Sequence, residues 1–268
     1  MKCLAGQLTG RTMYLSLPLC RILTQDELRA VVAHELAHFH GADTQYSLRF
    51  FPIYRGAVNS YVAAASAAYD EEGNPSWALL PAVAVLGHFL RSFAAAESKI
   101  SRERELVADR FAASVVNEHA ISSALVKIYA FSGYWAELLS TMHFSLKAGS
   151  VRAGDETYDP QLFFSNASRL FAAIAQGSAE GVPLHDLDEK KVAHPTDSHP
   201  PLSVRLESLH SSVAQVAMAA VNVSPERPAI ELLDEPEAIE VELSFVQQLL
   251  LCPELAHQSE DGASSLAV

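Results

Sequence analysis

"TQDELRAVVAHELAHFHG", residues 24–41, is the stretch that decides the fold. Thr24 and Glu27 have the spacing of a capping box, in which a hydroxyl and a carboxylate close the first turn of a helix. The apolar residues that follow recur at the 3.6-residue period, and the final glycine is well placed to end the helix. The stretch therefore predicts an amphipathic helix that carries His34 and His38 on one face.

These two histidines are four residues apart, so both imidazoles can reach one metal ion. Imidazole nitrogens bind Zn2+ at about 2.0–2.1 Å. Glu35 lies about 100° further round the helix, where it would reach a water on the metal rather than the metal itself. A carboxylate in that place can act as the general base of a metalloprotease. The alternative, a helix with solvent-facing histidines, is left open by this stretch alone.

A catalytic zinc keeps three protein ligands and one open position, so a third ligand is required. "ESKISRERELVADRFAASVV", residues 97–116, predicts a second helix, in which Glu105 and Asp109 are again four residues apart. Glu105 would complete a His-His-Glu site, and Asp109 would hold the outer nitrogen of a ligand histidine. The alternative is an exposed helix with Glu–Arg pairs. It does not explain why the two carboxylates lie beside the apolar Leu106 and Ala108.

The rest of the chain is expected to be mainly helical, with one strand. "TMYLSLPL", residues 12–19, has the β-branched and aromatic residues of a short strand. Residues 45–97 hold two apolar segments joined by "DEEGNPS", which predict a helical hairpin inserted between the two motif helices. Their apolar runs are shorter than the roughly 20 residues of a membrane span. Burial in protein, contact with a membrane surface and two spans all stay open.

The fold class expected is mainly α (α+β), with a small edge-strand element. Residues 1–222 are predicted to form one domain, followed by an acidic tail over 223–268. Further helices are expected over 122–142, with a break near Gly133, and over 159–177 and 199–220. The tail is expected to be extended or partly ordered, although its "IEVELSFVQQLLLC" could fold back as a short element.

Composition excludes some classes of function. The net charge of −13 argues against binding to nucleic acid, which needs a basic face. Much of this charge lies in the tail, where residues 226–261 contain ten acids and one base. The three cysteines show no close pairing, which argues against a disulfide framework and fits a reducing compartment. No secretory signal peptide is expected at the N-terminus.

Three motifs in order, "HELAH", "SRERELVADRFAA" and "SHPPLSVRL", resemble the membrane-associated zinc metalloendopeptidases that include HtpX and the type I CAAX prenyl proteases, which are gluzincins. The resemblance extends from about residue 12 to residue 209. It implies one Zn2+ per chain with His34, His38 and Glu105 as ligands, Glu35 as the base and Asp109 behind a ligand. It also implies that residues 45–97 are a membrane hairpin or a plug over the active site.

The resemblance implies roles for residues outside the two motif helices. His199 in "SHPPL" would lie near the catalytic centre, where a hydrogen-bond donor could stabilise an oxyanion. Arg205 would tie that helix to the site. His199 could equally be an ordinary loop histidine. Four further histidines are expected to be structural or surface residues: His40, His88, His143 and His194.

The segment before the first motif helix has a possible role in binding substrate. Gluzincins bind an extended peptide along an edge strand beside the zinc, by main-chain pairing. The resemblance places that edge at Met13, Tyr14, Leu15, Ser16 and Leu17. The alternative is an ordinary core strand.

The expected function is a zinc-dependent metalloendopeptidase that acts on a peptide or protein substrate in membrane-associated processing or quality control. Its active site would face the cytoplasm, with residues 50–97 at the membrane; otherwise the protein would be cytoplasmic. One alternative is a latent or inactive adaptor with the same fold. Another is a helical membrane-surface protein with a structural zinc, although such a site has no use for Glu35 and is usually closed by four protein ligands.

Overall fold

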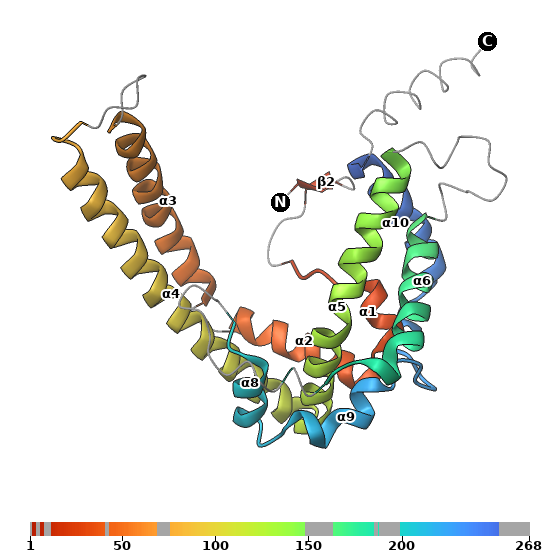
Figure 1. The fold of residues 1–268 in the computed structure, drawn as a ribbon. Coiled ribbons are helices and arrows are strands. Elements are labelled where there is room, and N and C mark those ends of the chain that lie inside the picture. Colours follow the sequence, from red (N-terminus) through yellow and green to blue (C-terminus); the bar gives the residue numbers. More distant parts are fainter. Residues whose placement is uncertain are drawn as a thin grey trace, which may run out of the picture.

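A computed structural model shows a mainly helical protein, as expected (Figure 1). The structure describes residues 2–3, 6–7, 12–40, 43–68, 76–147, 163–184, 187 and 199–251. The long helices are α2 (Gln25–His40), α3 (Asp43–Ala67), α4 (Leu80–Val115), α5 (Glu118–Lys147), α6 (Phe163–Ser178) and α10 (Pro236–Leu251). The shorter elements are α1 (Leu17–Ile22), α8 (Leu202–Ser208), α9 (Val213–Val221) and the 3-10 turns η2 (Ala179–Gly181) and η3 (Ala229–Leu232). Within these ranges the strands are β1 (Lys2–Cys3) and β2 (Gly6–Gln7), an antiparallel pair.

Helix α2 begins with the capping box that the sequence predicts. The backbone N–H of Thr24 donates to the Glu27 carboxylate at 2.7 Å, and the Glu27 N–H donates to Oγ1 of Thr24 at 3.1 Å. Small buried residues, Ala30 on α2 and Ala112 on α4, share one core cluster with Ile121 of α5. Because these side chains are short, α2 can pack closely between α4 and α5.

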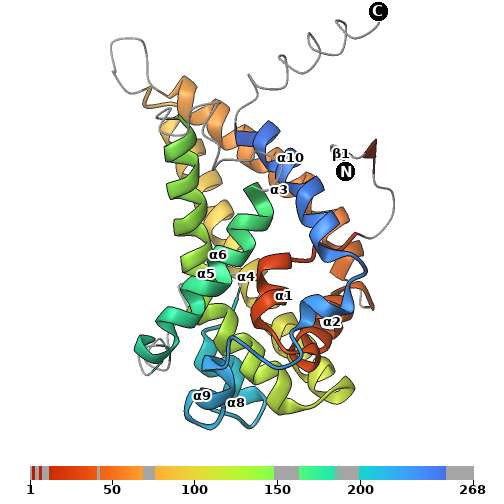
Figure 2. The same ribbon diagram turned by 90° about the vertical axis from the view of Figure 1, so that its right-hand side faces the viewer.

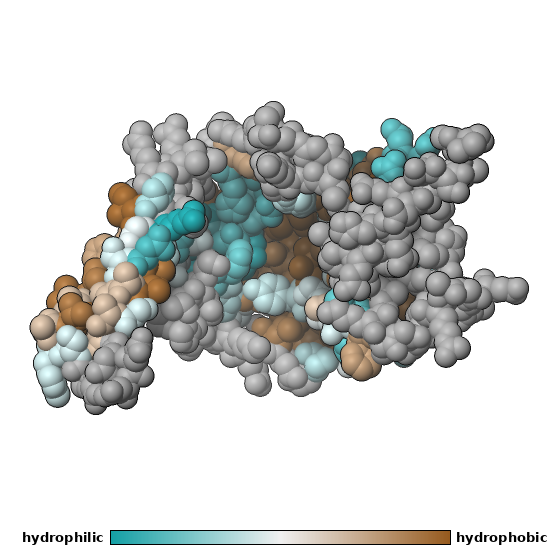
Figure 3. Space-filling view, turned by 90° about the horizontal axis from the view of Figure 1, so that it is seen from above, coloured by the Kyte–Doolittle hydropathy of each residue, from teal (hydrophilic) through white to brown (hydrophobic). Residues whose placement is uncertain are grey.

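The inserted helical hairpin consists of α3, the first half of α4 and the connection between them, of which residues 76–79 are described. It projects from the rest of the molecule (Figure 1). Several of its large apolar side chains are exposed: Ile53, Val62, Trp77, Val85 and Phe89. Apolar surface is visible at this end of the molecule in Figure 3. Among the described helices, none combines the length and apolar character that a membrane crossing requires.

The strand expected over residues 12–19 is wrong. Residues 12–16 have no regular structure, and Leu17 begins helix α1. The physical reason is Pro18, whose fixed φ suits the first turn of a helix and whose missing N–H weakens a strand. Leu17, Cys20 and Leu23 then bury their side chains at helical spacing in one cluster.

Two helix boundaries also differ from the expectation. Helix α5 runs through Gly133 without a break, because a single glycine costs a helix only about 1 kcal/mol. Packing of the flanking Phe131 and Leu138 against α6 offsets this cost. The helix expected over 199–220 is two helices, α8 and α9, separated by a turn in which His210 has a φ of 53°. Ser212 then caps α9 by accepting a hydrogen bond from the backbone of Gln215.

The segment after residue 222 contains η3 and α10, and its buried side chains, such as Ile230 and Glu240, pack against the helical body. Residues 223–251 thus follow the partly ordered alternative rather than the extended one, and the short element that "IEVELSFVQQLLLC" allowed lies in α10. Helix α10 packs against α6 (Figure 2). Its fully buried Glu240 accepts two hydrogen bonds from Arg21 of α1, at 3.0 and 2.6 Å. The division of the chain into domains at residue 222 stays a prediction.

Candidate metal centre

Helix α2 places two imidazole nitrogens next to each other. Nε2 of His34 and Nε2 of His38 are 3.3 Å apart, as the i, i+4 spacing predicts. His34 is buried, whereas His38 is partly exposed. The side chain of His40 and the whole of His194 lie outside the described residues.

Helix α4 brings a carboxylate to the same point. The Glu105 oxygens lie 3.6 Å from Nε2 of His34 and 3.4 Å from Nε2 of His38. Ligand atoms at about 2.0–2.1 Å from a tetrahedral zinc would lie about 3.3–3.4 Å from one another. These contacts, one to each Glu105 oxygen, approach that spacing, and with one ligand atom taken from each residue the three donors lie within 4.8 Å of one another. Their chemistry, two imidazoles and a carboxylate, suits zinc.

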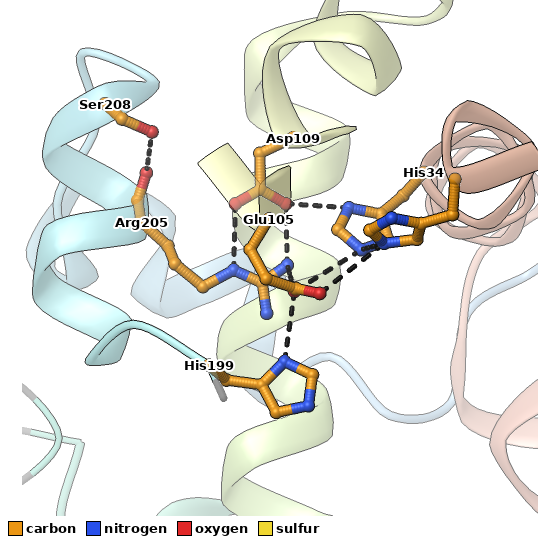
Figure 4. A network of polar contacts seen from close by, with 7 residues as sticks. His34, Glu105, Asp109, His199, Arg205 and Ser208 are labelled. Atoms are coloured by element: carbon orange, nitrogen blue, oxygen red, sulfur yellow. Dashed lines mark hydrogen bonds and ion pairs between the residues drawn. The ribbon is translucent and has the colours of Figure 1, made fainter. Parts of the chain in front are cut away.

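Asp109 contacts His34 at Nδ1, the ring nitrogen away from the other two donors, and Arg205 contacts Asp109 in turn (Figure 4). Oδ1 of the fully buried Asp109 is 2.9 Å from Nδ1 of His34, close enough for an ion pair although not aligned as a hydrogen bond. Arg205 of α8 donates two hydrogen bonds to Asp109, from Nε at 2.8 Å and from a terminal nitrogen at 2.6 Å. These contacts fix the ring of His34 from its outer side, and they tie α8 to α4.

The charges of this cluster shift one another's pKa values. Burial opposes ionisation of Asp109, but Arg205 and His34 more than offset it and hold the pKa of Asp109 below its usual value. Burial lowers the pKa of His34, yet contacts with Asp109 and Glu105 outweigh it and raise that pKa to about 9. Burial of Glu105 is likewise outweighed, so its pKa lies well below the usual range. Glu105 is therefore held in the charged form that a metal ligand requires, whereas a metal would have to displace the proton that these carboxylates favour on His34.

His199 reaches the same carboxylate from the loop before α8. Its Nδ1 is 3.1 Å from Oε2 of Glu105, and 62% of its side chain is exposed (Figure 4). The contact with Glu105 raises the pKa of His199. The third motif thus reaches the donor set in space, as the family resemblance implies.

A cavity of about 350 Å³ opens beside the three donors. Glu35, exposed on α2, lines this cavity together with the two histidines, as its position one residue after His34 predicts. One wall is apolar and is formed by Val31, Ile121, Leu125 and Ile128. Tyr129 of α5 also lines it, and no motif in the sequence marks this residue, which lies in a mostly apolar stretch of the helix.

The expected substrate edge is not brought to the cavity. Residues 13–17 are absent from its described lining. Tyr14 is largely exposed, and Leu17 is buried in α1. Residues 13–16 are not part of a β-strand, so the edge-strand element of the expected fold has no counterpart in this described segment. His88 and His143 do not line the cavity either, in line with their expected structural or surface roles.

A histidine pair on one helix, a carboxylate on a second helix and a glutamate beside them in one cavity are the parts from which a helical metallopeptidase is built. Comparison with known sequences agrees, since the model of peptidase family M48 matches residues 4–213. The chain belongs to peptidase family M48.

Curated relatives are similar to this chain over parts of their length. A "Protease HtpX homolog" of Archaeoglobus fulgidus is 25% identical over 207 residues, which cover 76% of this chain and 57% of that protein. Proteins of the same name from Pyrococcus furiosus and Ralstonia nicotianae are each 37% identical over 41% of this chain and 39% of their own length. The chain thus spans about half or less of these relatives. No solved structure matches it.

Proposed function

We propose that this protein is a zinc-dependent metalloendopeptidase that hydrolyses peptide bonds in peptide or protein substrates. The observation that carries the proposal is the convergence of His34, His38 and Glu105 at mutual distances of 3.3–3.6 Å, in a cavity that Glu35 also lines. When bound there, zinc would supply a Lewis acid that polarises water and the scissile carbonyl.

The chain's own residues then supply the proton transfers and the orientation. Glu35 takes a proton from the attacking water and passes it to the leaving amine. His199, exposed at the cavity, donates a hydrogen bond to the oxyanion that develops on the substrate. Asp109, held by Arg205, keeps the His34 ring in the orientation that presents Nε2 to the metal.

The apolar wall of the cavity supports a preference for substrates with a large apolar side chain beside the scissile bond. Ile121, Leu125 and Ile128 line this wall from α5, next to the metal ligands. A side chain that fills this space gains binding free energy in proportion to the apolar area that it buries. The intact set of ligands and base supports this enzyme over a latent or inactive adaptor.

As part of the same proposal, the α3–α4 hairpin contacts a membrane surface and the active site faces the cytoplasm. The exposed apolar side chains of the hairpin support the membrane contact, above all Trp77, which is 80% exposed. Tryptophan favours the membrane–water interface.

We expect vesicle flotation to be reduced in Trp77→Ser. Met218→Ser, which changes an exposed residue of α9, should float like the wild type. Equal flotation of both variants would refute this role of the hairpin.

The test of the enzymatic proposal measures bound zinc and casein cleavage for the wild type and for Glu35→Gln. The variant keeps all three proposed ligands but lacks a base. We therefore expect one zinc per chain in both proteins and a loss of cleavage of about 10²–10⁴-fold in the variant. The proposal fails if the wild type binds no zinc, or if Glu35→Gln cleaves casein as fast as the wild type.

A further inference from the structure

A second buried ionic cluster lies at the N-terminal end of α2, two helical turns before the first proposed ligand. The capping residue Glu27 is only 3% exposed, although a capping box is normally a surface feature. Its carboxylate accepts hydrogen bonds from Oγ of Ser123 at 2.5 Å and from Nζ of Lys127 at 2.8 Å, both on α5. It also accepts the N–H of Thr24. One side chain therefore caps α2 and joins it to α5.

Lys127 is fully buried and joins four segments of the chain. Besides Glu27, its ammonium group donates to the backbone oxygens of Ile22, the last residue of α1, at 3.1 Å and of Asn222, the residue after α9, at 2.8 Å. Three acceptors match the three donors of an ammonium group, so each of its hydrogens has a partner. The pair thus fixes the end of α1, the start of α2, the middle of α5 and the end of α9 around one point.

Stability alone is a weak reason for such a pair. Removing two charges from water costs about as much as their attraction returns, and well-packed apolar residues often serve a fold equally well. A fully bonded buried pair does, however, define one relative position of the elements that it joins. Here those elements are the helix with Glu35 and the helix whose Leu125 and Ile128, on either side of Lys127 in sequence, line the cavity.

We propose that Glu27 and Lys127 are positioning residues, which hold α2 against α5 so that the base on α2 and the apolar wall on α5 face one substrate. The role in catalysis rests on the proposed function. Neither residue lines the cavity, so the pair acts through the helices it joins. The metal ligands lie on α2 and α4, and metal binding should therefore change less than turnover does.

The test compares the wild type with Glu27→Gln/Lys127→Met, which removes both charges while keeping similar side-chain volumes. The single variants would each leave one buried charge unpaired and would unfold more readily. The matched control is Asp26→Asn/Arg29→Met, which removes an exposed ion pair of 2.7 Å on the same helix. Each protein is assayed for bound zinc, for kcat and KM on one peptide, and for amide hydrogen exchange along α2.

For the double variant we expect one zinc per chain, a KM within about threefold of wild type and a kcat lower by about tenfold or more, because small misplacements of reacting groups are costly. Exchange in the first turns of α2 should be faster by about tenfold. The control should match the wild type in all measurements. A kcat within twofold of wild type together with unchanged exchange would overturn the proposal.

Two further outcomes keep the test decisive. If the double variant does not fold, Ser123→Ala removes one hydrogen bond from Glu27 without unpairing a charge. We then expect faster exchange at the start of α2 and a kcat lower by about two- to threefold, and unchanged values would overturn the proposal. If the wild type cleaves no peptide, the proposed function fails, while hydrogen exchange still decides whether the pair holds α2 in place.

Discussion

Two groups of buried charged residues lie along α2. They differ in whether the acceptor atoms face hydrogen-bond donors or face one another. Around Glu27, the carboxylate accepts hydrogen bonds from Thr24, Ser123 and Lys127. Around Glu105, two imidazole nitrogens and a carboxylate converge within 3.6 Å of one another. The Glu27 group can hold helices together without a further ligand, because its carboxylate faces hydrogen-bond donors. In the Glu105 group, lone pairs converge on one point, which favours a proton or a cation between them.

The largest effect should come from removing the carboxylate of the metal cluster. Glu105→Gln replaces a charged ligand by a weakly coordinating amide, and we expect zinc binding to be lost at micromolar metal. Glu103→Gln is the matched control, because Glu103 is exposed on the same helix two residues earlier. Equilibrium dialysis with zinc measures the difference. If Glu105→Gln keeps one tightly bound zinc, the proposed ligand set is wrong.

A smaller effect is expected from the residue behind the ligand. Asp109→Asn removes the negative charge that faces Nδ1 of His34 and weakens the pairing with Arg205. Zinc affinity should fall by about 10- to 100-fold, as is usual when the partner of a ligand histidine is lost. Competition with a chromophoric chelator measures this change, and Asp26→Asn, at an exposed site of α2, serves as the control. An unchanged affinity would show that Asp109 does not support His34.

The proposed ligands also predict a pH dependence of the metal-free protein. The pKa of His34 is raised in the folded state, from 6.5 to about 9, by Asp109 and Glu105 against the effect of burial. Its contribution to the free energy of unfolding is therefore fully present below pH 6.5 and is lost as the pH rises to about 9. His199, whose pKa Glu105 raises, acts in the same direction.

The melting temperature of chelator-treated protein should consequently fall between pH 6.5 and 9. Saturating zinc should remove this trend, because a bound metal requires neutral imidazoles throughout. His34→Asn should weaken the trend in the metal-free protein. A melting temperature that rises over this range without metal would contradict the protonation of the cluster.

The smallest effect concerns substrate preference. Ile128→Ala enlarges the apolar wall of the cavity, so cleavage should shift by about tenfold from aliphatic toward aromatic side chains beside the scissile bond. The measurement is kcat/KM on a pair of peptides that differ at that residue. Ser132→Ala, at an exposed site one turn further along α5, is the control and should leave the ratio unchanged. An unchanged ratio in Ile128→Ala would show that this wall does not contact the substrate.

The sequence predicts that His34, His38 and Glu105 converge, because the information for this is local. The i, i+4 spacings of His34 with His38 and of Glu105 with Asp109 place each pair on one helix face, and a requirement for three ligands joins the two helices. The sequence does not predict helix α1, because a short apolar run with one proline is equally typical of a strand.

Contacts between distant residues account for the rest. Arg21 pairs with Glu240, 219 residues further along the chain, and this partner turns a seemingly solvated acidic segment into a packed helix. Lys127 lies in an apolar stretch of α5, and its pairing with Glu27 across 100 residues follows from no local pattern. The charge and hydrophobic periodicity of a segment predict its local structure. They do not identify the residue elsewhere in the chain with which a charged side chain pairs.

The most direct test of the central claim is the X-ray absorption spectrum of zinc bound to the wild-type protein. Two imidazoles and one carboxylate predict a first shell of nitrogen and oxygen at about 2.0–2.2 Å, with the outer-shell scattering of two histidine rings. Glu35→Gln should give the same protein ligands. A sulfur shell at about 2.3 Å, or a spectrum with no histidine scattering, would contradict the proposed site.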